Sequence, residues 1–295
     1  MLLVTIENLE VQYGKQTALK IKTPIIIEKG DRIGVIGSNG AGKSTLIKSL
    51  LGLNHYKGNI RTELNRSDMA VHLQENEYVN SMPVKYIIEG ILNTKIKSNS
   101  RLKELISFFE FEQCLSKRFR ALSGGQKQRL TIIMVLMQNS PLTFYDEVTS
   151  GLDFETRQRL MGKLVEWYKE KDSSLVVVSH YYEELEQLVD KILILDKGNV
   201  VAFGRKEELF KRYCGGAVII LENTQENEML TKDFEKLESP RHLIALACRE
   251  RETELKVIAL LISRNINFKR SNDDIEIMSI NAKHVYYQKG GNSNE

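Results

Sequence analysis

The sequence predicts an α/β fold with a largely parallel sheet, followed by a small α+β unit. Short apolar and β-branched runs alternate with stretches whose apolar residues recur every three or four positions, the pattern of strands interleaved with helices. A break follows Gly215 and Gly216, because residues 1–215 carry a net charge of +5 whereas residues 216–295 carry eleven Lys and Arg against thirteen Asp and Glu. We therefore expect two structural units that meet near this glycine pair.

The composition is that of a folded protein from a reducing compartment. With 42% hydrophobic and 27% charged residues in 295 positions, the chain can bury a large core, which excludes wholesale disorder. The net charge of +3 is too small to indicate nucleic acid, and we expect no such partner. Cys114, Cys214 and Cys248 are too far apart for a zinc motif or a disulfide framework. Apolar runs such as residues 132–137 are far shorter than the ~18 residues of a membrane span.

The first half of the chain is expected to start with strands and continue with helices. Alternating or β-branched apolar residues predict strands at 2–6, 11–13, 25–27 and 32–36, a helix at 43–51, and further strands within 60–75. From residue 83 to about 120, apolar residues at three- and four-residue spacing predict helices, and another helix follows at 125–137.

The second half continues the alternation and then changes character. We expect strands at 142–145, 175–178, 192–195 and 200–203, with helices at 154–171 and 182–189. After the glycine pair we expect strands at 217–222, 242–248, 266–270 and 274–280, with helices at 228–237 and 251–264.

A phosphate-binding loop is the strongest single motif. Residues 37–45 read GSNGAGKST, which matches G-x-x-x-x-G-K-[ST] between an expected strand and an expected helix. Glycines let backbone N–H groups approach a triphosphate, and the helix start adds its positive dipole end. Lys43 is expected to reach the β- and γ-phosphates, and the Ser44 hydroxyl to bind Mg²⁺. This motif alone leaves kinases, GTPases and motors open. The expected nucleotide-binding residues here are Asn39, Gly40, Ala41, Gly42, Lys43, Ser44 and Thr45.

The segment LSGGQ at 122–126, extended by KQR, narrows the class because it resembles the signature of ABC ATPases. LTFYDE at 142–147 resembles the Walker B strand of that family. The resemblance implies that Asp146 holds Mg²⁺ and that Glu147 is the general base for the attacking water. His180, after the strand LVVVS, resembles the switch histidine that contacts the γ-phosphate.

Further motifs of the family follow its usual order. Gln74 in VHLQE resembles the Q-loop glutamine, which senses Mg²⁺ and the nucleophilic water, and Tyr13 resembles the aromatic residue that stacks on adenine. A packing role stays the alternative for Tyr13. SGLD at 150–153 resembles the D-loop, so Asp153 would touch the opposite subunit. Val148 departs from the family, which usually has proline there; since no reacting group is lost, we expect activity to survive.

The resemblance implies a P-loop NTPase fold over residues 1–214. This ABC ATPase domain would contain a RecA-like core, an N-terminal antiparallel β-subdomain and an inserted helical subdomain at about 76–122. Residues 216–295 would form an α+β accessory domain, in which MSINAKHVYY at 278–287 loosely resembles a closing strand and short helix.

The resemblance also implies a head-to-tail homodimer that encloses two ATP molecules. Ser123, Gly125 and Gln126 of one subunit would close on the γ-phosphate held by the other. Glu147, His180 and Gln74 would then support hydrolysis, which removes the bridging phosphate and reopens the dimer.

The function implied by the resemblance is that of the ATP-hydrolysing subunit of an ABC transporter. It would lie at the cytoplasmic face of the membrane, without a span of its own, and drive a separate integral membrane permease. Exposed apolar residues at Tyr78, Val79, Tyr86 and Ile87 are expected to help form the permease groove. The C-terminal extension resembles those of export and resistance ATPases, which favours export of a peptide, drug or toxin-like substrate. The alternatives are an importer ATPase and a soluble ABC ATPase acting on ribosomes or DNA.

Overall fold

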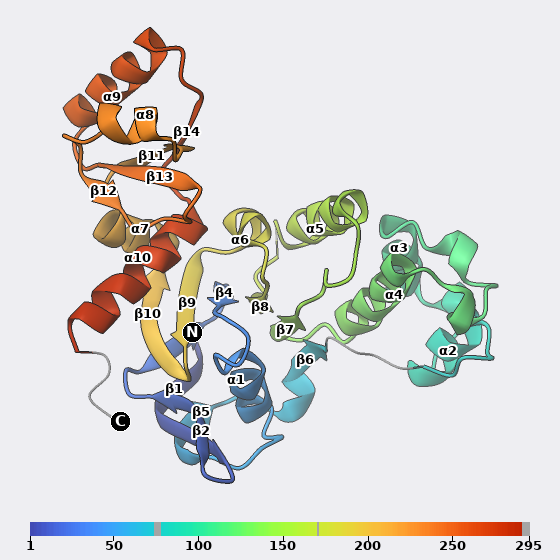
Figure 1. Ribbon diagram of the computed structural model, residues 1–295. Helices are drawn as coiled ribbons and strands as arrows, with labels where there is room; N and C mark the ends of the chain where they lie inside the picture. The colour runs from blue at the N-terminus through green and yellow to red at the C-terminus, as the bar shows by residue number, and fades with distance from the viewer. Residues whose placement is uncertain (74–77, 170, 291–295) are drawn as a thin grey trace.

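The computed structural model describes residues 1–73, 78–169 and 171–290, and its framework is one large sheet. The strand order is β3-β1-β2-β10-β9-β4-β8-β7-β6, with β5 paired to β1 (Figure 1). The strands are β1 (Leu2–Tyr13), β2 (Gln16–Ile21), β3 (Ile25–Glu28), β4 (Arg32–Ile36), β5 (Lys57–Thr62), β6 (Met69–His72), β7 (Leu142–Asp146), β8 (Ser174–Val178), β9 (Lys191–Asp196) and β10 (Asn199–Arg205).

The sheet has a parallel part and an antiparallel part. Strands β6, β7, β8, β4 and β9 pair in parallel, whereas β1 pairs antiparallel with β2, β3 and β5. All five residues of β7 and of β8 are buried, as expected for parallel strands covered on both faces. The carboxyl ends of β4, β7 and β8 therefore meet at one edge, and the residues that follow them are brought together.

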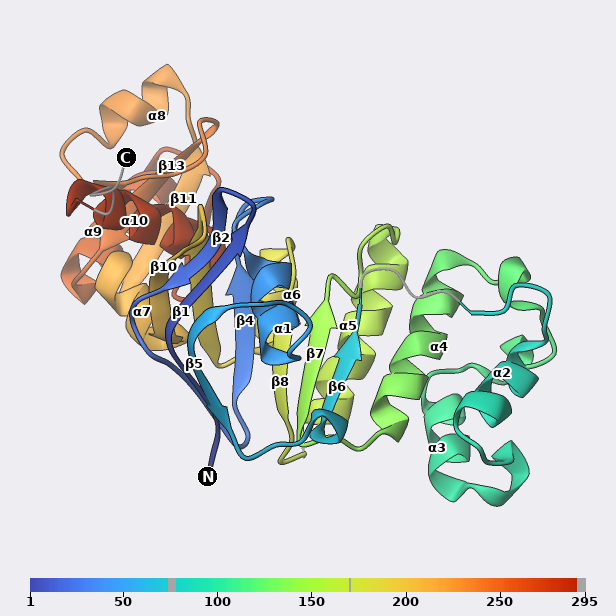
Figure 2. The ribbon, with the colours of Figure 1, turned by 90° about the horizontal axis from the view of Figure 1, so that it is seen from below.

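Helices cover this sheet and extend from one end of it. They are α1 (Lys43–Leu50), α2 (Val84–Ile91), α3 (Ser100–Phe108), α4 (Gly124–Met137), α5 (Phe154–Tyr168) and α6 (Tyr182–Leu188). Short 3₁₀ turns occupy Arg66–Asp68, Ile96–Ser98, Glu112–Cys114 and Phe119–Ala121. Helices α2, α3 and α4 form an arm at one end of the molecule, opposite the C-terminal part in both ribbon views (Figures 1 and 2). No helix in the described ranges is long and apolar enough to cross a bilayer.

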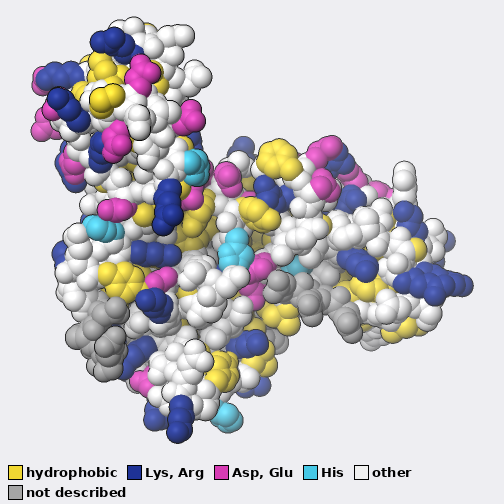
Figure 3. Space-filling view, in the orientation of Figure 1, with side chains coloured by type: hydrophobic (Ala, Val, Ile, Leu, Met, Phe, Trp, Pro, Cys, Tyr) yellow, Lys and Arg dark blue, Asp and Glu magenta, His cyan; other side chains and the backbone are white. Residues whose placement is uncertain are grey.

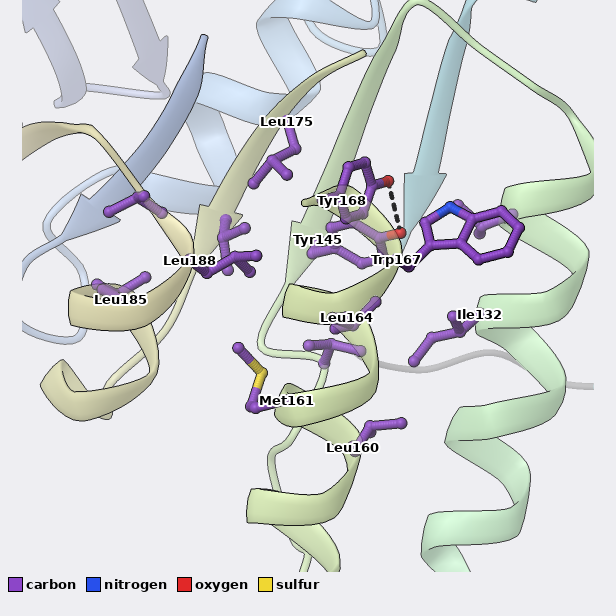
Figure 4. Close-up of a cluster of buried hydrophobic side chains, with 14 of the residues drawn as sticks. Ile132, Tyr145, Leu160, Met161, Leu164, Trp167, Tyr168, Leu175, Leu185 and Leu188 are labelled. Carbon is purple, nitrogen blue, oxygen red and sulfur yellow. Dashed lines mark hydrogen bonds between the residues drawn. The ribbon is translucent and has the colours of Figure 1, made fainter. Parts of the chain in front are cut away.

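The core between the sheet and the arm is built on aromatic residues. Figure 4 shows Trp167 and Tyr168 of α5 against Tyr145 of β7 and Ile132 of α4. The hydroxyls of Tyr145 and Tyr168 are 3.0 Å apart and hydrogen-bonded, so neither polar group is buried without a partner. Burial raises the pKa of Tyr145 well above its ordinary value. Because each hydroxyl has a hydrogen-bond partner, both tyrosine side chains can lie in the core with little loss of stability.

A second, smaller sheet follows Gly216. Its order is β12-β13-β11-β14, formed by β11 (Ala217–Glu222), β12 (Lys236–Leu237), β13 (Leu243–Cys248) and β14 (Phe268–Ser271). The helices around it are α7 (Lys206–Tyr213), α8 (Gln225–Leu230), α9 (Arg251–Ser263) and α10 (Ile275–Gln288). Helix α9 packs Val257 and Leu261 on this sheet, whereas α10 returns to lie against α7, α6 and β10 (Figure 1).

The strand expected at 274–280 is wrong, and so is the closing strand and short helix expected for MSINAKHVYY at 278–287. One helix, α10, spans these residues. The Asp274 side chain accepts the backbone N–H of Ile277 at 3.0 Å and caps the helix start. Ile275, Met278 and Ala282, at three- and four-residue spacing, are buried in the core shared with α7. The alternating apolar residues of this segment predicted a strand, but packing on both of its sides stabilises a helix instead.

The helix expected at 228–237 is also wrong. Thr224 caps α8, which ends at Leu230. The chain then turns so that Lys236 and Leu237 pair with β13 as an edge strand. Strand β2 and helix α7 were not predicted from the sequence, and α5 ends at Tyr168 instead of residue 171.

Replacing Asp274 by alanine tests the cap of α10. Asp274→Ala should lower the free energy of unfolding by about 1 kcal/mol, because the N–H of Ile277 loses its acceptor in a buried place. Urea denaturation measures this difference. Asp274→Asn keeps a capping oxygen and serves as the control, with a loss below about 0.5 kcal/mol. Equal losses in the two variants would assign the effect to charge instead of capping.

Candidate functional site

The phosphate loop connects β4 to α1 and is held by backbone contacts that only glycine permits. A Cβ on Gly37 would lie 2.4 Å from the carbonyl oxygen of Leu195, at the end of β9. A Cβ on Gly42 would lie 2.8 Å from the carbonyl oxygen of Ala18, and Gly42 has a left-handed φ of +100°. The loop is therefore seated between β9 and β2.

Lys43 is folded back over this loop. Its side chain is buried, and Nζ donates hydrogen bonds to the carbonyl oxygens of Gly37 (2.8 Å) and Ser38 (3.2 Å). Burial lowers the pKa of Lys43, while the carboxylates of Glu147 and Asp146 act in the opposite direction. The ammonium group is thus already at the loop where phosphates would bind.

Ser44 and Asp146 provide oxygen atoms suited to a small divalent cation. Asp146 is the last residue of β7, and burial raises its pKa, while a hydrogen bond with Ser44 acts to lower it. Mg²⁺ prefers oxygen ligands and commonly takes one or two from the protein, with phosphates and water as the others. The pair fits that demand. Within the residues described, no group of three or more His, Cys, Asp and Glu could hold a metal by itself.

Glu147 and His180 form a pair at the carboxyl ends of β7 and β8. His180 Nε2 donates a hydrogen bond to Glu147 Oε1 at 2.7 Å. Glu147 has a left-handed φ of +52°, which is sparsely populated for a non-glycine residue and occurs at functional sites. Its N–H donates to the carbonyl of Val178 (3.0 Å), and the next residue, Val148, is buried. Burial of Val148 anchors the backbone where the related family usually has proline.

One cleft of about 940 Å³ brings together Lys43, Ser44, Glu147 and His180, whereas Asp146 is not among its lining residues. Tyr13 stands at its edge with 53% of its surface exposed, as a ring available for stacking. Lys197, from the β9–β10 turn, also lines the cleft but was not predicted from the sequence. A lysine next to a glycine in a short turn is only a weak indication of a binding residue. The strand β2 was also missed, and with it Gln16, Thr17 and Ala18. The cleft is lined by these four residues and by Tyr13, Asn39, Gly40, Ala41, Gly42, Lys43, Ser44, Thr45, Glu147 and His180.

The remaining expected site residues lie elsewhere. Ser123 and Gln126 form a capping box at the start of α4: the Gln126 N–H donates to Ser123 Oγ (3.3 Å), and the Ser123 N–H donates to Gln126 Oε1 (3.1 Å). Gly125 packs against Thr156 of α5, and Asp153 caps α5 by accepting the Thr156 N–H at 3.0 Å. None of these four lines the nucleotide cleft of its own chain. Gln74 lies outside the described residues.

Comparison with known proteins identifies the family. The sequence profile of the family described as "ABC transporter" matches residues 23–150. The linearmycin resistance ATP-binding protein LnrL of Bacillus subtilis is 30% identical over 237 residues, which cover 75% of each chain. This chain belongs to the ABC transporter ATP-binding family. It is an ATPase that binds ATP and couples hydrolysis to transport as the ATP-binding subunit of an ABC transporter.

Other relatives of this ABC ATPase include a methionine import protein and a manganese transport protein. The methionine import ATP-binding protein MetN of Clostridioides difficile is 28% identical over 283 residues, covering 87% of this chain and 86% of that protein. The manganese transport ATP-binding protein MntB of Halalkalibacterium halodurans is 30% identical and covers 70% and 88%. The fold agrees with a solved ATP-binding subunit of an ABC transporter, with a TM-score of 0.62 at 23% identity over 72% of this chain and 93% of that one.

The seating of the phosphate loop can be tested at Gly37. In Gly37→Ala the added methyl group meets the Leu195 carbonyl, so the loop must shift, and ATP affinity should fall at least about tenfold. A binding titration with a fluorescent ATP analogue measures the change. Gly162→Ala is the matched control, because nothing lies within 4 Å of its added Cβ, and its affinity should equal wild type. Unchanged affinity in Gly37→Ala would show that the loop adapts without loss.

Proposed function

We propose that this chain drives a membrane permease by closing and opening as a head-to-tail dimer around two ATP molecules. One observation carries the proposal: the cleft assembles the phosphate loop, Glu147 and His180, while Ser123 and Gly125 lie outside it. A second chain placed head to tail brings its own α4 start to this open side. The N-terminus of a helix offers N–H groups and a positive dipole to an anion, which suits a γ-phosphate.

The residues of the cleft divide the work of hydrolysis. Lys43 exchanges its carbonyl partners for the β- and γ-phosphates, which are stronger acceptors. Ser44 and Asp146 would hold Mg²⁺, which would supply positive charge to neutralise the phosphates. Glu147 accepts a proton from the attacking water, and His180 fixes the carboxylate through the 2.7 Å bond. Tyr13 stacks on the adenine ring. As the resemblance to the family implies, Gln74 senses Mg²⁺ and the attacking water, and Asp153 touches the opposite subunit.

Removing the carboxylate of Glu147 should separate ATP binding from hydrolysis. Glu147→Gln keeps the size of the side chain but loses the base, so turnover should fall at least about 100-fold while ATP still binds. Colorimetric phosphate release measures turnover, and light scattering should detect a dimer trapped by Mg-ATP. Glu252→Gln on α9 is the control and should behave as wild type. Wild-type turnover in Glu147→Gln would remove this residue from the base role.

We further propose that the arm binds a cytoplasmic helix of the permease. A groove of about 520 Å³ runs along α2, and its lining is apolar: Tyr78, Val79, Met82, Tyr86, Ile87, Gly90 and Ile91. Tyr86 and Ile91 are 55% and 58% exposed, so a large apolar surface is left uncovered by the residues that the structure describes. Lys85 lies at its border, with Nζ 5.8 Å from the Tyr86 ring centroid, and basic side chains gather at the outer end of the arm (Figure 3). The partner helix would be apolar with an acidic flank.

Export is the transport direction we propose, supported by the resistance protein LnrL at 30% identity. Import is the second candidate, because the methionine import protein of Clostridioides difficile matches a larger share of the chain. Inside-out vesicles containing the chain and its permease distinguish the two. With ATP outside, an exported compound accumulates in the lumen, whereas an imported one is released from it.

The groove can be tested by making it polar. The double variant Tyr86→Ser with Ile91→Ser should lower the amount of permease that copurifies at least about tenfold, since two central apolar anchors are lost. Basal ATPase activity should stay within about twofold, because neither residue lines the nucleotide cleft. Ile262→Ser on α9, 65% exposed, is the control for a general loss of surface apolarity. Full recovery of permease with the double variant would place the docking site elsewhere.

A further inference from the structure

Helix α10 contacts the segment that supports the phosphate loop. Helix α10 crosses from the small sheet back onto the large one (Figures 1 and 2). Near its end, the Tyr287 hydroxyl donates a hydrogen bond to Asp196 Oδ2, and Lys283 Nζ lies 3.6 Å from Asp196 Oδ1. Tyr287 and Lys283 are four residues apart, so they lie on the same face of the helix.

Asp196 joins this helix to the phosphate loop. It ends β9 and is 9% exposed, and its Oδ1 accepts a hydrogen bond from the Ser38 hydroxyl at 3.4 Å. Two residues later, the N–H of Gly198 donates to the carbonyl of Ala41 at 3.2 Å. The β9–β10 turn therefore holds the loop near its beginning and near its middle.

The charge of Asp196 makes its partners matter for a nucleotide. A free carboxylate bonded to the phosphate loop would repel the phosphates that the loop receives. Lys283 supplies a compensating positive charge, and the Tyr287 hydroxyl occupies the second carboxylate oxygen. Burial and the bond to Asp196 raise the pKa of Tyr287 to about 12, so the phenol stays a donor at neutral pH. Lys197, which lines the cleft, has Nζ 5.5 Å from the centroid of the same ring.

We infer that Tyr287 and Lys283 are positioning residues of the nucleotide site. Through Asp196 they hold Ser38, and with it the first half of the phosphate loop, in the arrangement that receives ATP. The C-terminal helix thereby sets the affinity of the site for nucleotide from outside the cleft. This inference rests on the proposed nucleotide site. The alternative is that the contact only holds α10 on the large sheet and has no effect on nucleotide affinity.

Tyr287→Phe removes the hydroxyl but keeps the ring, and so tests the link with little loss of packing. The KM for ATP should rise about 3- to 10-fold, with kcat within about twofold of wild type. Lys283→Gln should raise KM in the same range, and Lys283→Arg, which keeps the charge, should restore it. Tyr286→Phe is the matched control and should leave KM unchanged. A lowered melting temperature with unchanged KM in Tyr287→Phe would overturn the inference in favour of simple fastening.

A double-mutant cycle tests the path through the loop. If Tyr287 acts through Asp196 on Ser38, then in a Ser38→Ala background Tyr287→Phe should change KM by less than about 1.5-fold. An equal rise in both backgrounds would overturn the path. Direct binding of ATP to the wild-type chain is measured first. Absence of that binding would overturn the proposed nucleotide site itself, whereas normal wild-type binding with unaltered variants would overturn only the role of α10.

Discussion

The nucleotide cleft depends on the close approach of three backbone segments at the end of β4. Gly37 lies against the end of β9, and Gly42 and Gly198 both lie against the carbonyl of Ala18 in β2, with no room for a side chain at any of the three. These contacts join the parallel part of the sheet to its antiparallel part. Because the loop is fixed there, the carboxyl ends of the neighbouring strands β7 and β8 bring a carboxylate pair and a histidine to the same place.

The charged groups at this cleft are paired within the chain, and Lys43 and Asp146 are also buried. Lys43 is satisfied by loop carbonyls, Asp146 by Ser44, and Glu147 by His180. The phosphates and Mg²⁺ of a bound nucleotide would bind these side chains at least as strongly as their present partners do. Nucleotide binding therefore exchanges one partner for another and leaves no charged side chain unpaired on the way. The left-handed backbone at Glu147 shows that its side-chain direction is imposed by the surrounding structure, since a free chain rarely adopts it.

Local sequence predicted most of the parallel sheet, because strands buried on both faces appear as unbroken apolar runs such as SLVVV in β8. It failed where packing, not pattern, decided the outcome. β2 alternates weakly around Lys20, and α10 carries an alternating apolar stretch that folds as a helix because both of its sides are covered. At the site, the loop and the residues after β7 and β8 could be predicted from their motifs. Lys197 could not, since only the pairing of β9 with β4 brings its turn to the cleft.

The return of α10 to the large sheet has a consequence for how the chain is made. Ile275, Met278 and Ala282 belong to the same buried cluster as Leu209 and Phe210 of α7, which are synthesised more than sixty residues earlier. Domains fold as their residues leave the ribosome, from the N-terminal end onward. Until α10 has left the ribosome and packed, the nascent chain presents this apolar surface uncovered. Folding of the ATPase therefore waits for residues that are made after all of its nucleotide cleft, and chains that stop before α10 would expose an apolar surface that chaperones and proteases recognise.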